Sequence, residues 1–223
     1  MQTIHDWKDR PMEVARSRGG VLAVVNPRDN LVTTGISPWP PPEIVQKLYK
    51  SDLIRAFDEP DRTAVQRALG FYSNLQSLHS EDAITWSVFG TLAYADPDAK
   101  LAFTKSLLEH LHIPVPAPKS VNIWLWRRVP HPDNYREGGP EIDFGIQTEQ
   151  LVLCGEAKWL SGIGQGQGQA RNKNQLELRH EFFRKFGHSF FGPASQHVII
   201  VLRLNGGLVE EIPAAPQASS LHT

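Results

Sequence analysis

Two carboxylates and a lysine stand on two neighbouring apolar stretches of this chain. Asp143 lies in the stretch 141–148, and Glu156 and Lys158 lie near the end of the apolar run 151–159. Ionised side chains in apolar surroundings are costly unless they are paired or bound to a metal, so such groups are functional candidates. Carboxylate oxygens are the ligands that Mg²⁺ prefers, and a lysine beside them can orient a water or take its proton. The trio therefore predicts metal-assisted hydrolysis of a phosphodiester. The alternative is a same-face ion pair of Glu156 and Lys158 at a strand edge.

The hydrophobic pattern predicts how the three side chains are held. Apolar residues alternate with Asp143 along 141–148, and 151–159 is almost continuously apolar, which is typical of a strand buried on both faces. The connection between them is short and polar enough for a hairpin. Because side chains alternate along a strand, Glu156 and Lys158 share one face. If the hairpin puts Asp143 on that face, the three groups converge.

The motif PEID at 140–143, followed by EAK at 156–158, resembles the signature of the PD-(D/E)xK nuclease superfamily. One additional residue pair separates Pro140 from the aspartate. The resemblance covers residues 80–204 and implies a restriction-endonuclease-like fold. It implies that Asp143 and Glu156 bind Mg²⁺ or Mn²⁺, and that Lys158 is the catalytic lysine.

The order of elements expected for that fold is helix, three antiparallel strands, helix, strand. A helix is predicted over 80–93, where Ile84, Val88 and Leu92 recur at helical spacing and should pack on the sheet. Other predicted elements are a helix over 98–111, strands over 121–129 and 195–204, and a helix over 171–186. The fold class is therefore α/β, with a mixed central sheet flanked by helices.

Glu81 opens the first of these helices, and the resemblance implies that a first-helix glutamate completes the metal site. Asp82 is the alternative for this role. The alternative for both acids is a purely structural role, in which their negative charges interact favourably with the helix dipole in the first turn.

The helix 171–186 supplies further candidates. Gln175 could reach Lys158 or the attacked phosphate, as the resemblance implies, or it is a surface residue beside a core stripe. Arg179 could bind a phosphate with two hydrogen bonds, or pair with Glu177 or Glu181.

The glycine-rich segment 162–169 lacks the spacing of a nucleotide-binding loop, so a flexible connector is its default interpretation. The sharper interpretation is a mobile loop over the substrate, with Arg171 and Lys173 contacting phosphates. A nucleotide-binding protein is the corresponding rival function.

Residues 1–79 form a predicted N-terminal extension, mostly helical. It should contain a hairpin of 21–25 with 31–34, a helix over 43–49 and a second helix over 61–76. The core is expected over 80–204 and a flexible tail over 205–223.

Composition restricts the function classes. The chain has 223 residues and a net charge of −1, which argues against indiscriminate electrostatic binding to nucleic acid. Cys154 is the only cysteine, which excludes a disulfide or a cysteine-based zinc site within one chain. The sequence shows no signal peptide and no long apolar span, so we expect a soluble cytoplasmic protein without membrane contact.

The expected function is that of a metal-dependent nuclease that hydrolyses DNA, with RNA left open. By resemblance alone, an effector of a prokaryotic defence system is the expected setting. The chain carries no recognisable sequence-reading module, so a second copy or a targeting protein is the expected partner. The alternative is a non-catalytic subunit with a nuclease fold that binds nucleic acid or scaffolds a complex.

Overall fold

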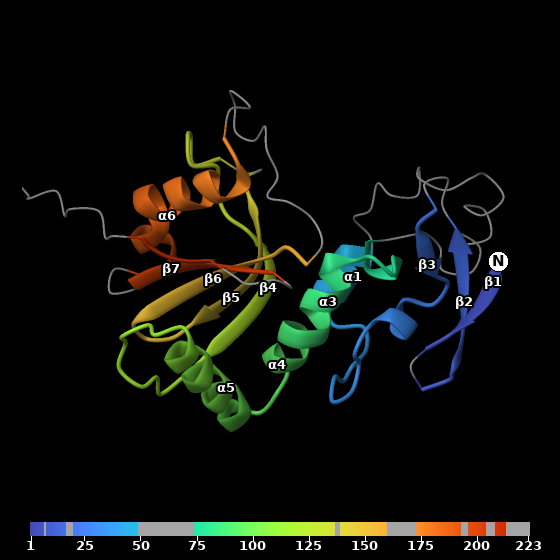
Figure 1. Ribbon diagram of the computed structural model, residues 1–223. Coiled ribbons are helices and arrows are strands. Elements are labelled where there is room, and N and C mark those ends of the chain that lie inside the picture. Colours follow the sequence, from blue (N-terminus) through green and yellow to red (C-terminus); the bar gives the residue numbers. More distant parts are fainter. Residues whose placement is uncertain are drawn as a thin grey trace, which may run out of the picture. The chain divides into compact units, whose positions relative to one another are not determined.

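The computed structural model describes residues 1–6, 8–16, 20–48, 74–136, 139–159, 173–192, 196–203 and 208–212. The chain forms two compact units, Met1–Ala95 and Asp96–Thr223 (Figure 1). The predicted boundary at residue 80 differs from this division, because the helix that starts at Glu81 belongs to the first unit. Most of the predicted helix 61–76 and the glycine-rich segment 162–169 lie outside the described residues.

The first unit begins with an antiparallel sheet of three strands, β1 (Gln2–His5), β2 (Pro11–Arg16) and β3 (Leu22–Val24). The predicted hairpin of 21–25 with 31–34 is wrong, because β3 pairs with the preceding strand β2. The residues after β3 turn instead into the 3-10 helix η1 (Pro27–Asn30), where the Asn26 side chain accepts a hydrogen bond from the Arg28 N–H. Helix α1 (Pro42–Leu48) starts at the predicted proline.

The predicted helix 80–93 is confirmed, but it contains a π-helical turn. After the 3-10 turn η3 (Asn74–Gln76), it runs through α3 (Glu81–Thr85), the π turn η4 (Trp86–Gly90) and α4 (Thr91–Ala93).

The buried stripe of this helix differs from the predicted one. Ile84 and Val88 are 40% and 39% exposed, whereas Trp86 and Phe89 are buried. Ala83, Trp86 and Phe89 also recur at helical spacing, so the helix buries a different face from the one predicted. Trp86 Nε1 donates to the Val32 carbonyl at 3.0 Å, which anchors this stripe within the first unit.

In its described residues, the second unit has one sheet and two long helices. Its elements in chain order are α5 (Pro97–His110), β4 (Asn122–Arg128), β5 (Glu141–Gln147), β6 (Leu151–Ala157), α6 (Gln175–Phe191), β7 (Gln196–Leu202) and β8 (Leu208–Ile212). The strands lie in the sheet in this order; β6 and β7 are parallel and every other neighbouring pair is antiparallel. Helices α6 and α5 lie on opposite sides of the sheet (Figure 1). The predicted α/β class with a mixed sheet is confirmed, whereas residues 208–212 of the predicted tail form the fifth strand.

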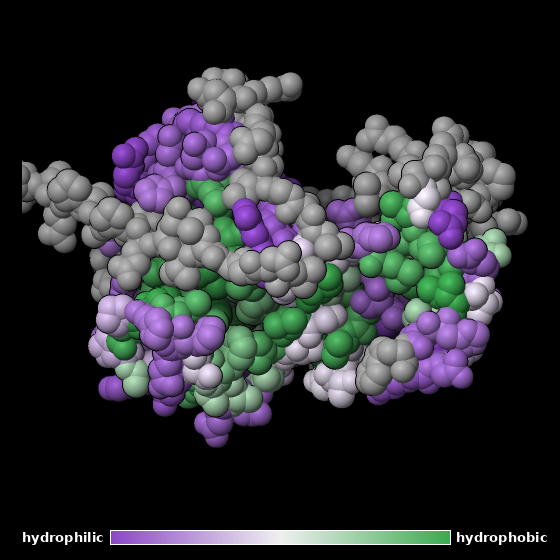
Figure 2. All heavy atoms as spheres, viewed as in Figure 1, coloured by the Kyte–Doolittle hydropathy of each residue, from purple (hydrophilic) through white to green (hydrophobic). Residues whose placement is uncertain are grey.

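Helix α6 buries an apolar face on the sheet. The residues of this core include Leu176, Phe182, Phe183 and Phe191 of the helix with Val152, Cys154, Ile199 and Val201 of β6 and β7. In the space-filling view, apolar side chains gather over the sheet while α6 turns a hydrophilic face outward (Figure 2). Among the described helices, none has the length and apolar character needed to cross a membrane.

Two glycines covered by aromatic rings set the register of the strands that carry the predicted site. Trp124 of β4 pairs with Gly145 of β5, and Phe144 of β5 pairs with Gly155 of β6. A Cβ atom on Gly145 would fall 2.0 Å from the Trp124 ring, and one on Gly155 would fall 1.9 Å from the Phe144 ring. A slip by one residue would bring a side chain under each ring and turn every side chain to the other face.

We predict that Gly155→Ala lowers the free energy of unfolding by about 1–3 kcal/mol, because the new methyl group must displace the Phe144 ring in a packed core. Chemical denaturation measures the loss. Ala102→Leu, which enlarges an exposed side chain on α5, should change stability by no more than about 0.5 kcal/mol. Equal stability of Gly155→Ala and the wild type would contradict the proposed origin of the register.

His197 of β7 is buried between aromatic rings. Its imidazole is 2% exposed, and its centroid lies 5.2 Å from the Phe183 ring and 4.8 Å from the His188 ring. Burial, assisted by the charge of His188, lowers the pKa of His197 to about 4. The imidazole is therefore neutral at physiological pH.

Because its pKa falls from the ordinary 6.5 to about 4, the folded protein binds fewer protons at His197 than the unfolded chain does between these values. Stability from this group is complete above pH 6.5 and is lost as pH falls. We expect the wild type to lose about 1–2 kcal/mol more than His197→Leu between pH 7.5 and 5 in urea denaturation. His110→Leu, at an exposed position, is the control and should retain the wild-type pH dependence of stability. If stability depends on pH in the same way in the wild type and in His197→Leu, the lowered pKa of His197 is refuted.

Candidate metal and catalytic site

The predicted convergence of the two acids is confirmed. Phe144 of β5 is paired with Gly155 of β6. The two residues next to this pair on the antiparallel strands, Asp143 and Glu156, therefore lie opposite each other on the face of the sheet toward α6. The carboxylate of Asp143 crosses to β6, where its Oδ2 accepts a hydrogen bond of 2.8 Å from the Ala157 N–H. This bond leaves Oδ1 for another ligand.

Glu156 is the most deeply buried ionisable group of the site. Its side chain is 1% exposed and lies between two cations. Lys158 Nζ is 2.7 Å from Oε1, and Arg179 Nη2 is 2.5 Å from Oε2. Lys158 is itself only 9% exposed, so this charged cluster lies inside the protein. Removing one partner of such a pair leaves a buried charge uncompensated, which is strongly destabilising.

Arg179 reaches Glu156 because α6 starts at a fixed point. Asn174 caps the helix by accepting from the Glu177 N–H, and the Glu177 side chain accepts from the Asn174 N–H in return. One turn later, Arg179 donates to the carbonyl oxygens of Gln175 at 3.0 Å and of Glu141 at 2.6 Å. The guanidinium therefore ties the start of α6 to the start of β5 and to Glu156 of β6.

The pKa of Asp143 is raised to about 7, first by burial and then by the negative charge of Glu156. The Ala157 N–H and the charges of Arg179 and Lys158 offset part of this shift. Two acids that repel each other in a poorly solvated place favour a proton or a cation between them.

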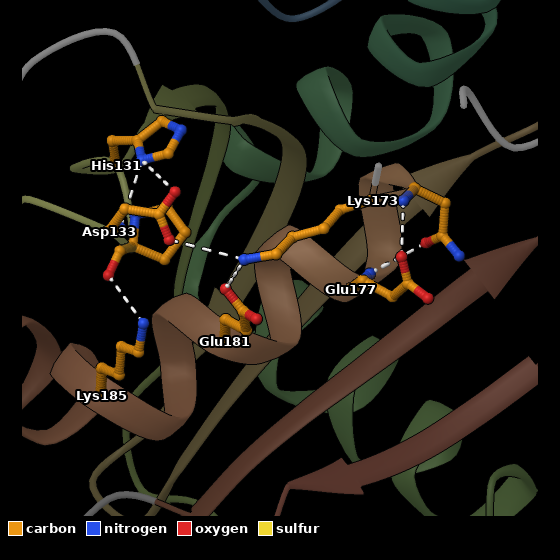
Figure 3. A network of polar contacts seen from close by, with 8 residues as sticks. His131, Asp133, Lys173, Glu177, Glu181 and Lys185 are labelled. Atoms are coloured by element: carbon orange, nitrogen blue, oxygen red, sulfur yellow. Dashed lines mark hydrogen bonds and ion pairs between the residues drawn. The ribbon is translucent and has the colours of Figure 1, made fainter. Parts of the chain in front are cut away.

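The other predicted residues of α6 and its approach are Gln175, Lys173 and Arg171. Gln175 is the first residue of the helix and is partly buried. Lys173 is bound by acids of the protein, with Nζ 2.6 Å from Glu181 Oε2 and 3.5 Å from Asp133 Oδ1 (Figure 3). Arg171 lies outside the described residues.

The predicted partners of Arg179 are corrected by these contacts. Glu177 belongs to the helix cap and Glu181 binds Lys173, whereas the arginine binds Glu156. By helical spacing, Arg179 shares one face of α6 with Leu178 and Phe182, and a charge on that apolar face is the sequence signal for a buried partner.

Glu81 belongs to the first unit, on α3, so its predicted part in the metal site stays a prediction. Its alternative, Asp82, has a different partner within the first unit. Lys47 Nζ of α1 lies 3.2 Å from Asp82 Oδ2.

A polar network fastens the loop before β5 to the outer side of α6 (Figure 3). Lys185 Nζ donates to the Pro132 carbonyl at 3.2 Å, and Asp133 lies between His131 and Lys173. These contacts hold the segment 131–133 against α6.

The donor set fits a hard divalent cation. Mg²⁺ is commonly held by one or two protein carboxylates together with water and substrate phosphate oxygens. Asp143 and Glu156 supply two carboxylates on adjacent strands. Within the described ranges, no three His, Cys, Asp or Glu side chains gather as a metal-binding group.

The sequence matches no family model, and no curated protein matches it. The nuclease family to which the motifs point is therefore a proposal, carried by the residues themselves.

The raised pKa of Asp143 predicts a pH dependence of stability. Between the ordinary value of 3.8 and about 7, the folded state binds more protons at this carboxyl than the unfolded chain, so its contribution is lost as pH rises through that window. We expect Asp143→Asn to gain about 1–3 kcal/mol relative to the wild type between pH 5 and pH 8.

Denaturant titrations of both proteins at the two pH values test this expectation without added metal. Asp98→Asn, an exposed acid on α5, is the matched control and should follow the wild type at both pH values. A constant stability difference between Asp143→Asn and the wild type would show that the carboxyl titrates normally.

Proposed function

We propose that the second unit is a metal-dependent nuclease of the PD-(D/E)xK superfamily, with a restriction-endonuclease-like core that hydrolyses DNA phosphodiester bonds. The observation that carries the proposal is the meeting of Asp143 and Glu156 on one sheet face, with Lys158 held 2.7 Å from Glu156. The order α5, three antiparallel strands, α6 and a parallel strand also agrees with that core. In this proposal α5 replaces the helix 80–93 as the first core helix.

Asp143 and Glu156 would hold Mg²⁺ or Mn²⁺ through carboxylate oxygens. When bound, such a cation neutralises charge on the phosphate and makes water a better nucleophile. Asp143 supports this role because its carboxylate lies on the same sheet face as that of Glu156, on the adjacent strand.

Lys158 orients the attacking water and stabilises the charge that develops on the phosphate oxygens. Its ammonium is partly desolvated and fixed by Glu156, which is the setting in which a lysine acts with a defined direction. Gln175, at the start of α6, is proposed to assist in placing the phosphate.

A second candidate function is a non-catalytic subunit that keeps the fold and binds nucleic acid. The specific observation in its favour is the ion pair of Arg179 with Glu156, which engages an oxygen that a metal would use. In both cases a net charge of −1 gives weak electrostatic attraction to nucleic acid. A second copy of the chain or a targeting protein is then the proposed route to the substrate, with prokaryotic defence as the proposed setting.

Digestion of plasmid DNA and of a matched RNA with Mg²⁺, Mn²⁺ or EDTA tests the proposal. The wild type should cleave DNA only with metal, and Asp143→Ala and Lys158→Ala should each reduce the rate about 100-fold or more, since each removes a group from the reaction centre. Lys105→Ala removes an exposed lysine of α5 and should leave the rate unchanged.

The alternatives give different results in the same assay. Cleavage that survives both substitutions would refute the site. If DNA migrates more slowly in a gel but is not cleaved with Mg²⁺, Mn²⁺ or EDTA, the non-catalytic subunit is favoured. If only RNA is cleaved, the proposed substrate is RNA instead of DNA.

A further inference from the structure

The charges around Glu156 balance without any metal. With both acids ionised, Asp143 and Glu156 carry two negative charges, and Lys158 and Arg179 carry two positive ones. The next acid along β5, Glu141, has its own partner, with Arg128 Nη2 3.5 Å from its Oε2. Among the described residues, the four-group cluster is therefore neutral when both acids are ionised.

A divalent cation would leave this cluster with an excess of two positive charges. Glu156 and Arg179 are 1% and 3% exposed, so water screens this excess poorly. A phosphodiester contributes one negative charge, and the hydroxide needed for hydrolysis contributes another. The complete reaction complex is neutral again.

Without Arg179 the cluster loses one positive charge. Two acids and one lysine carry a net negative charge, which attracts a divalent cation before any substrate is present. Three protein groups hold the guanidinium: the carboxylate of Glu156 and the carbonyl oxygens of Gln175 and Glu141. Its fixed position makes it a permanent part of the charge balance.

We propose that Arg179 couples metal binding to substrate binding, so that the site takes up its cation tightly only together with a nucleic acid phosphate. The proposal rests on the proposed nuclease function and adds to it a regulation of the same site. Arg179 is a positioning residue in this scheme, since it acts through Glu156. Thermodynamic linkage requires the reverse effect as well, so the cation tightens nucleic acid binding by the same factor.

Mn²⁺ binding to the full chain, measured by the paramagnetic resonance signal of free Mn²⁺, tests the coupling directly. Titrations are made without nucleic acid and with a phosphorothioate DNA duplex, which keeps the backbone charge and resists hydrolysis. The wild type should bind Mn²⁺ about tenfold more tightly with the duplex, which is a typical size for coupled sites. Arg179→Met and Arg179→Gln should bind Mn²⁺ about tenfold more tightly than the wild type when DNA is absent, and their coupling should fall below about threefold.

Arg184→Met is the matched control, because it removes an exposed arginine from the same helix and should retain the wild-type values. Arg179 variants that bind Mn²⁺ no better than the wild type without DNA would overturn the proposal, as would wild-type coupling below about threefold. Circular dichroism checks that both variants are folded; if neither folds, the wild-type coupling decides.

Asp143→Asn separates this inference from the proposed function. If it binds Mn²⁺ as tightly as the wild type, the metal site itself is wrong and the coupling proposal fails with it. If Asp143→Asn loses Mn²⁺ and the wild type cleaves DNA, while the Arg179 variants match the wild type, only the coupling proposal fails.

Discussion

The second unit depends on the neutralisation of one buried carboxylate. Glu156 lies inside the protein with 1% of its surface exposed, so its charge requires partners at short distance. Lys158 and Arg179 provide them from the end of β6 and from the first turns of α6. These contacts fix the helix against the sheet at the place where the functional candidates meet.

This ionic cluster could form only in one register of the strands. The rings of Trp124 and Phe144 lie over Gly145 and Gly155, and these contacts align β4, β5 and β6. Asp143 then lies beside Glu156, and its hydrogen bond to Ala157 follows from the same alignment. Apolar packing thus decides the geometry, and the charged groups exploit it.

Local sequence patterns predicted the strands and helices of the second unit well, because their apolar periodicity is strong and their turns are polar. The same method failed where pairing or helix geometry is decided at a distance. Nothing near Leu22–Val24 reveals that this strand joins the one before it. In the helix 80–93, helical spacing fits both the exposed pair Ile84 and Val88 and the buried pair Trp86 and Phe89, so spacing alone could not choose the buried face. The strand Leu208–Ile212 was missed because its two acids resemble a solvated tail, although it pairs with β7 at the sheet edge.

The candidate site was predictable in part for the same reason. Asp143, Glu156 and Lys158 follow from strand alternation across a single hairpin, which fixes their relative positions within a few residues. Arg179 reaches Glu156 from a helix 23 positions further along the chain, and its direction depends on where Asn174 starts that helix and on how α6 rests on the sheet.

A motif defined by acids and a lysine therefore understates the electrostatics of the site. In the proposed metal site, the buried arginine changes the net charge of two ionised acids and one lysine from negative to neutral, which would weaken the attraction for a cation. Chains with the same three motif residues should differ in their affinity for metal according to whether a buried cation of this kind lies against the glutamate.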